Sequence, residues 1–161
     1  MKKILSFVIV VMAVLGVLTA CGSNEKKANI EKDVYVLNLN GADLEATFHH
    51  DGDKLKKVGQ KMTYPLSYFG VKEGEKLDDA TKKNYEKQAK EQYKAYENGK
   101  GTSLKSEFTD EALTIEMFVD LEKADEAQIS SLLQGTSDAK NVSYEETVSA
   151  FEAQGFKKKE S

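Results

Sequence analysis

Residues 34–49, which read Val-Tyr-Val-Leu-Asn-Leu-Asn-Gly-Ala-Asp-Leu-Glu-Ala-Thr-Phe-His, decide the fold of this chain. The first six residues favour an extended strand, because β-branched and aromatic side chains fit a pleated surface. Asn40-Gly41 suits a two-residue turn that needs positive φ angles. From Leu44 to His49 apolar and polar residues alternate, which is the period of a half-buried strand. The stretch therefore predicts an antiparallel β-hairpin.

Further strands extend this hairpin. After a second turn signal at Asp51-Gly52, alternation places Val58, Met62 and Tyr64 on one face of a third strand, and Pro65 ends regular pairing. Residues 34–64 thus predict a three-stranded antiparallel meander. Two more strands are expected later in the chain, over residues 102–108 and 112–121.

The helices have a different period. Residues 78–98 place apolar side chains three and four positions apart, which predicts an amphipathic helix capped by Asp78. A short helix is expected over residues 125–135, and a third over 143–155, after which Phe156 folds back on it. The order β-β-β-α-β-β-α-α predicts an α+β domain: an antiparallel sheet of about five strands with helices packed on one face.

The N-terminus carries an export signal. Residues 1–20 have a basic start, an apolar run too short for a stable membrane span, and small residues at the end, as in a secretory signal peptide. Leu18-Thr19-Ala20-Cys21 resembles the bacterial lipobox. That resemblance implies cleavage between Ala20 and Cys21 and a diacylglyceryl group on the Cys21 sulfur. An uncleaved anchor and an ordinary secreted protein are the alternatives.

Behind the signal we expect two regions. Residues 21–32 form the lipidated N-terminus and a flexible polar tether, and residues 33–161 form a single α+β domain. Without residues 1–20 the chain has 141 residues, a net charge of −6 and no arginine. The acidic balance argues against a nucleic-acid partner. The expected partners are the membrane, through the lipid on Cys21, and another protein of the cell envelope.

Few residues suggest chemistry. Tyr85, Tyr93 and Tyr96 form one stripe of the long helix, and they either make a ligand surface or pack on the sheet. His49 and His50 are adjacent on a strand and point to opposite faces, so they do not share a metal ion there. Only a bend at the turn would bring His50 near Asp51 and Asp53 as a weak exposed site. We expect no catalytic residue, no metal, no cofactor and no enzymatic activity.

Several stretches carry a family resemblance: Leu37-Asn38-Leu39-Asn40-Gly41, Gly52-Asp53-Lys54, Leu113-Thr114-Ile115-Glu116-Met117 and Gln154-Gly155-Phe156-Lys157. With these the chain resembles the YehR-like small bacterial lipoproteins, a family with a domain of unknown function. The resemblance implies a lipid-anchored α+β domain outside the cytoplasm. It supplies no catalytic residues to carry over.

Two functions stay open at this point. One is a surface-tethered binding or interaction module, which predicts an exposed apolar patch or sheet edge. The other is a small-ligand-binding or hydrolytic protein, which predicts a pocket between sheet and helices, near the three tyrosines.

Overall fold

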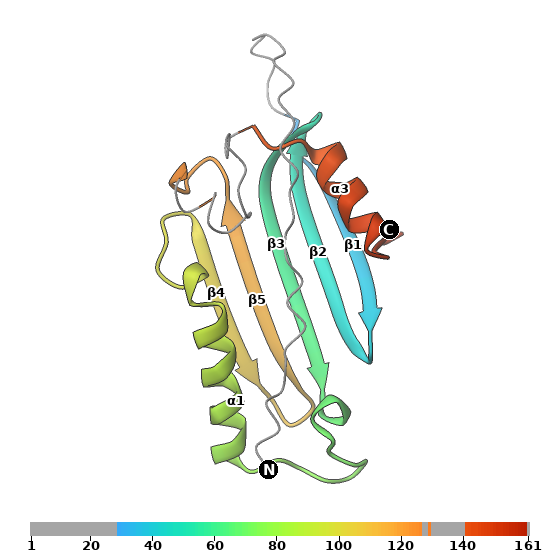
Figure 1. Ribbon diagram of the computed structural model, residues 1–161, viewed down its shortest axis with the longest axis vertical. Helices are drawn as coiled ribbons and strands as arrows, with labels where there is room; N and C mark the ends of the chain where they lie inside the picture. The colour runs from blue at the N-terminus through green and yellow to red at the C-terminus, as the bar shows by residue number, and fades with distance from the viewer. Residues whose placement is uncertain (1–28, 127–128, 130–140, 161) are drawn as a thin grey trace.

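The computed structural model describes residues 29–126, 129 and 141–160. They form one six-stranded antiparallel sheet with the strand order β4-β5-β3-β2-β1-β6 (Figure 1). The strands are β1 (Glu31–Leu39), β2 (Ala42–Asp51), β3 (Lys54–Pro65), β4 (Thr102–Phe108), β5 (Ala112–Asp120) and β6 (Lys157–Lys158). The helices are α1 (Asp79–Gln92) and α3 (Tyr144–Ala153), with short 3-10 turns at η1 (Leu66–Phe69) and η2 (Lys94–Tyr96). The predicted α+β class and antiparallel sheet are confirmed.

The meander forms as its turn residues predict. Asn40 has a φ of 52° and Gly41 a φ of 86°, so the β1–β2 turn has the positive angles that this pair allows. The β2–β3 register shifts between His49 and His50, where β3 carries one extra residue.

The first strand begins earlier than expected. Glu31 pairs with His50 and Lys32 with His49, although the sequence assigns both to the tether. Because β2 extends to Asp51, its backbone offers hydrogen-bonding partners to these polar residues.

Both helices pack on the same face of the sheet, near its opposite edges (Figure 1). On the β4 side, the Tyr85 ring of α1 lies 6.0 Å from the Phe108 ring. On the β1 side, the Phe151 ring of α3 lies 5.1 Å from the Phe48 ring in an edge-to-face contact. The other face of the sheet carries no helix among the described residues, and we call it the helix-free face.

The long helix is shorter than predicted. It ends at Gln92, and η2 follows it, instead of continuing to Asn98. The tighter turn buries both Tyr93 and Tyr96 against the sheet. Periodicity does not detect this change, because a 3-10 turn also repeats apolar residues at three-residue spacing.

The C-terminal segment closes the other edge of the sheet. Gly155, with a φ of 97°, ends α3, and the buried Phe156 packs its ring 4.9 Å from that of Phe151. The chain then pairs with β1 as β6, which brings the sheet to six strands. The helix expected over residues 125–135 lies mostly outside the described residues, as do Ala20 and Cys21.

Candidate functional site

A row of uncharged residues crosses the helix-free face. Each member pairs directly with the next on the neighbouring strand, so the row follows from the strand register. We call it the neutral row; from β4 to β1 it consists of Ser103, Phe118, Gly59, Thr47 and Val34. Phe118, Thr47 and Val34 are half-buried, although no described helix covers them.

Charged rows flank the neutral row on both sides. The first, which we call the Lys–Glu row, contains Lys105, Glu116, Lys61 and Glu45 in register. Its charges alternate in sign, and the Lys61 Nζ lies 3.4 Å from the Glu116 Oε1. On the other side, Lys57 and Asp120 are paired, with 3.6 Å between Nζ and Oδ2.

His49 also belongs to this second flank. Burial, followed by the positive charges of Lys32 and Lys57, lowers the pKa of His49 below its ordinary value. The imidazole is therefore neutral at pH 7, and this flank presents it as a neutral donor or acceptor.

Gly59 leaves a hollow in the neutral row. A cavity of about 370 Å³ opens there, with Phe118, Thr47 and Ser103 among its walls. A second hollow of about 260 Å³ lies beyond the Lys–Glu row and shares Lys61, Lys105 and Glu116 with the first. The two hollows are thus separated only by the Lys–Glu row.

The three tyrosines of the predicted stripe lie on one side of the α1–η2 segment in the structure, but they face the protein interior and not the solvent. Tyr93 and Tyr96 are 7% and 9% exposed. Burial raises the pKa of Tyr93 to about 12. The half-buried Tyr85 lies against Phe69, with 4.7 Å between the ring centroids. All three rings act as packing groups between α1, η2 and the sheet.

A small cavity lies between the sheet and the C-terminal segment. This cavity, beside Met62 and Phe156, holds about 10 Å³, and the side chain of Gln60 is buried there. That volume is about the room for one water molecule. It is far below the several hundred Å³ of typical ligand pockets.

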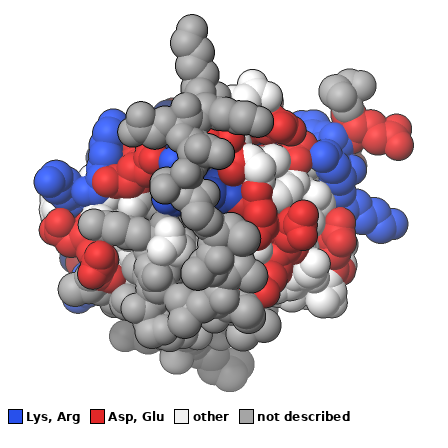
Figure 2. Space-filling view, turned by 90° about the horizontal axis from the view of Figure 1, so that it is seen from above, with Lys and Arg blue, Asp and Glu red and all other residues white. Residues whose placement is uncertain are grey.

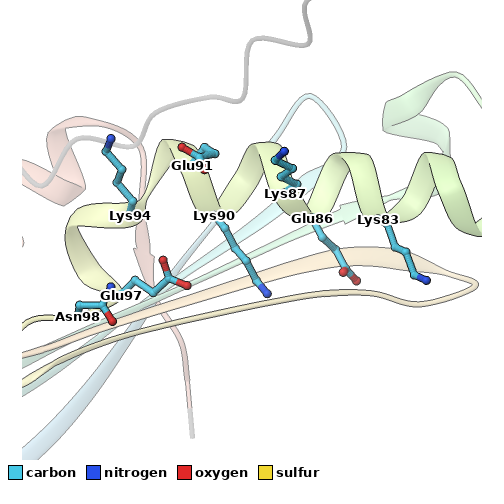
Figure 3. A pocket seen from close by; sticks show the side chains of 8 residues that line it. All are labelled: Lys83, Glu86, Lys87, Lys90, Glu91, Lys94, Glu97 and Asn98. Carbon is cyan, nitrogen blue, oxygen red and sulfur yellow. The ribbon is translucent and has the colours of Figure 1, made fainter.

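The outer side of α1 has a larger hollow of about 540 Å³ (Figure 3). Its lining contains charged side chains and one asparagine: Lys83, Glu86, Lys87, Lys90, Glu91, Lys94, Glu97 and Asn98. Glu86 is already engaged, because its Oε1 accepts a hydrogen bond from the Phe108 backbone N–H at 2.6 Å. The apolar atoms in this hollow belong to these charged and polar residues, and no aromatic or aliphatic side chain of the described residues lines it. Through Glu86 this side of α1 is tied to the edge of β4, which it shields.

The two histidines separate as predicted. His50 is buried on the helix side, where its ring stacks on Tyr144 at 3.6 Å and its Nδ1 lies 2.8 Å from the Gly52 carbonyl oxygen. Tyr144 donates a hydrogen bond to Asp33, and the Lys158 Nζ lies 2.7 Å from Asp33 Oδ1. These contacts hold β1, β2, α3 and β6 together.

The neighbouring acidic residues serve the fold in the same way. Asp53 Oδ1 accepts hydrogen bonds from the Ser143 hydroxyl at 2.9 Å and from the Glu145 N–H at 2.8 Å, at the start of α3. Within the described ranges, no group of three or more His, Cys, Asp or Glu residues is placed to hold a metal ion.

Charges of both signs also mix over the end of the molecule shown in Figure 2, where lysine and acidic side chains lie next to one another. None of the helices formed by the described residues is long and apolar enough to cross a membrane.

The neutral row was not recognised from sequence. On the same face of their strands, two positions before and after them, Thr47, Gly59 and Phe118 each have charged or polar residues, which is the pattern of an ordinary solvated face. Only the register between strands places them side by side. The signal that could have found them is the pair of an exposed-face glycine and an exposed-face phenylalanine in adjacent strands.

These features define a small α+β domain with one helix-covered and one open sheet face. The chain belongs to the DUF1307 family of proteins of unknown function, whose model matches residues 31–157. This confirms the predicted family resemblance, since the structure is similar to that of the YehR protein of E. coli, solved by NMR. The TM-score is 0.61 at 22% sequence identity, over 83% of this chain and 93% of that one.

Two further relatives are named as lipoproteins, and one further solved structure has the same fold. The chain is 29% identical to the uncharacterized lipoprotein Lin0239 of Listeria innocua over 155 residues, which is 94% of this chain and 92% of that protein. It is also 29% identical to the uncharacterized lipoprotein Lmo0207 of Listeria monocytogenes, over 92% of this chain and 90% of that one. An NMR structure of a protein from Streptococcus pneumoniae TIGR4 has a TM-score of 0.55 at 14% identity, over 90% of this chain and 94% of that one, and shares the fold.

Proposed function

We propose that this chain is a non-catalytic binding module of the cell envelope that is held at the membrane by lipid on Cys21. It binds its ligand with the helix-free face, at the hollow over Gly59. The observation that carries this proposal is the neutral row with its hollow of about 370 Å³ on a sheet face that no described helix covers.

The anchor is supported by the relatives, which are lipoproteins, and by the Leu18-Thr19-Ala20-Cys21 sequence. In this proposal residues 1–20 are removed by cleavage between Ala20 and Cys21. Two acyl chains on Cys21 give stable attachment, because each buried CH₂ contributes about 0.8 kcal/mol. The residues from Cys21 up to Glu31, where β1 begins, then link the lipid to the domain on the outer side of the cytoplasmic membrane.

The proposal of a non-catalytic role rests on the family and on the hollow itself. The family is of unknown function, and no relative named above carries an enzyme name. The hollow has one lysine–glutamate ion pair and no histidine in its walls. It therefore lacks the serine–histidine pair that many hydrolytic enzymes use. The pocket between sheet and helices is not favoured, because the cavity beside Gln60 has room for one water molecule.

The test is photo-cross-linking in intact cells. A benzophenone-bearing amino acid replaces Phe118 in the hollow, and a matched variant carries it at Lys87 on the outer side of α1. We expect an adduct to an envelope component from position 118 and not from position 87. Equal adducts from both positions, or none from position 118, would contradict binding at the helix-free face.

A further inference from the structure

The chemistry of the hollow points to a ligand class. We propose that the two hollows of the helix-free face bind a neutral, hydroxyl-rich saccharide chain. This inference rests on the proposed function, because it names the ligand of the same face.

Charge balance is the first argument. The charged side chains that line the two hollows are Lys61, Lys105, Glu107 and Glu116, so their formal charges cancel. They are also paired, with 3.4 Å between Lys61 and Glu116 and 3.2 Å between Lys105 and Glu107. An anionic or cationic ligand would meet a repelling charge beside each attracting one. A neutral ligand meets no such penalty.

Hydrogen-bonding capacity is the second argument. An ammonium group has three donor hydrogens and a carboxylate about four acceptor sites, so each pair retains donors and acceptors for a ligand. The hydroxyls of Ser103 and Thr47, in the first hollow, and of Thr114, in the second, add groups that can both donate and accept. A ligand with many hydroxyl groups can use this mixture all along its length.

The floor of the first hollow supplies an apolar contact. Phe118 stands half-buried beside Gly59, which has no side chain to cover the ring. The face of an aromatic ring carries partial negative charge and attracts polarised C–H groups. A sugar ring has both a C–H face and a hydroxyl rim, and therefore matches both the floor and the walls.

An extended peptide matches less well. Peptides that bind to sheets take up free backbone N–H and C=O groups at an edge strand. The hollows lie over β4, β5, β3 and, at Thr47, β2, and in β5, β3 and β2 the backbone is paired on both sides. Only β4 is an edge strand, and the N–H of its Phe108 is already bonded to Glu86 of α1. A peptide lying across the hollows would thus have to bind mainly by its side chains.

The test uses the full lipidated chain in detergent and three immobilised panels. These are uncharged oligosaccharides of hexose and N-acetylhexosamine units, acidic oligosaccharides, and neutral peptides. The decisive variant is Gly59→Val, which places a branched side chain in the hollow. Its Cβ fits, because the nearest neighbour, the Thr47 Cβ, would lie at 3.7 Å, and the melting temperature of the variant reports whether the two methyl groups fit as well. The matched control is Thr63→Val, a similar side chain on the same face outside both hollows.

We expect the wild-type chain and Thr63→Val to retain an uncharged oligosaccharide. Gly59→Val should weaken this binding at least about tenfold while its melting temperature does not fall. Equal binding by Gly59→Val, retention of acidic oligosaccharides or peptides alone, or no retention would overturn the saccharide proposal.

The cross-linking experiment separates this failure from that of the proposed function. An adduct from position 118 without any saccharide retention would support binding at the helix-free face and contradict the saccharide proposal. If Gly59→Val does not change saccharide retention and position 118 gives no adduct, both the binding face and the saccharide proposal are contradicted.

Discussion

At the scale of single residues, two glycines of this sheet domain have opposite requirements. Gly59 has ordinary backbone angles, and an added Cβ would find its nearest neighbour at 3.7 Å. Gly101 has a φ of 75°, and a Cβ there would meet the Ala124 nitrogen at 2.8 Å. We therefore expect Gly59→Ala to raise the free energy of unfolding by about 0.5–1 kcal/mol, because glycine is unfavourable inside a strand. Gly101→Ala should lower it. Urea unfolding of both variants checks the signs, and a loss of stability in Gly59→Ala would contradict the packing described for the hollow.

Asp33 gives a prediction for the acid range. Burial raises the pKa of Asp33. Hydrogen bonds from Lys158 and Tyr144 and the charge of Lys158 together lower the pKa by more, so it lies below its ordinary value. An acid whose pKa falls on folding stabilises the folded state above its unfolded pKa, and loses that contribution as the pH falls through the folded pKa. Asp33→Asn should thus cost on the order of 1–3 kcal/mol at pH 7, since it removes the charge that accepts these bonds.

The cost should shrink as the pH falls below about 4, the ordinary pKa that the carboxyl has in the unfolded chain, and through the lower pKa of the folded protein. Urea unfolding of both proteins between pH 2.5 and pH 7 measures it. A difference that stays constant over this range would mean that Asp33 contributes through shape and not through charge. Asp43→Asn serves as the control, because Asp43 lies exposed on the other face.

At the scale of elements, the cap of α3 decides how this helix is attached. The Ser143 hydroxyl accepts a hydrogen bond from the Glu146 N–H at 3.1 Å and donates one to Asp53 at 2.9 Å. Ser143→Ala removes both, so we expect it to cost about 1–2 kcal/mol. Hydrogen exchange of the α3 amides should speed up accordingly. Ser149→Ala, at an exposed position of the same helix, should leave exchange unchanged, and equal effects of the two variants would rule out the cap as the cause.

The elements also show what the sequence could and could not predict. The alternation from Leu44 to Phe48 and the Asn40-Gly41 turn gave the first hairpin, because such patterns depend only on neighbours in the chain. Lys157 and Lys158 carry no alternation, and they form β6 because Phe156 packs on Phe151 and brings them beside β1. The neutral row could not be predicted from the sequence either, because it depends on contacts between distant parts of the chain, namely the register across five strands.

At the scale of the whole molecule, the anchor gives the clearest test. Cys21→Ser should move the protein from the membrane fraction to the soluble fraction and abolish the incorporation of labelled fatty acid, because serine has no thiol to accept a diacylglyceryl group. Fractionation and metabolic labelling measure the two effects. Ser23→Ala, two residues further on, is the control. Membrane attachment that survives Cys21→Ser would contradict the proposed anchor.

The way in which β1 lies in the sheet has a mechanical consequence. The chain enters the sheet at Glu31, and β1 is bonded to β2 through nine residue pairs and to β6 through two. Asp33, near the entry point, is held by Tyr144 and Lys158 from the C-terminal part of the chain. A pull on the proposed tether acts along the strand, so it loads these pairs together in shear instead of opening them one after another. We therefore expect the domain to resist unfolding best when the force acts through its proposed lipid anchor, in the direction of β1.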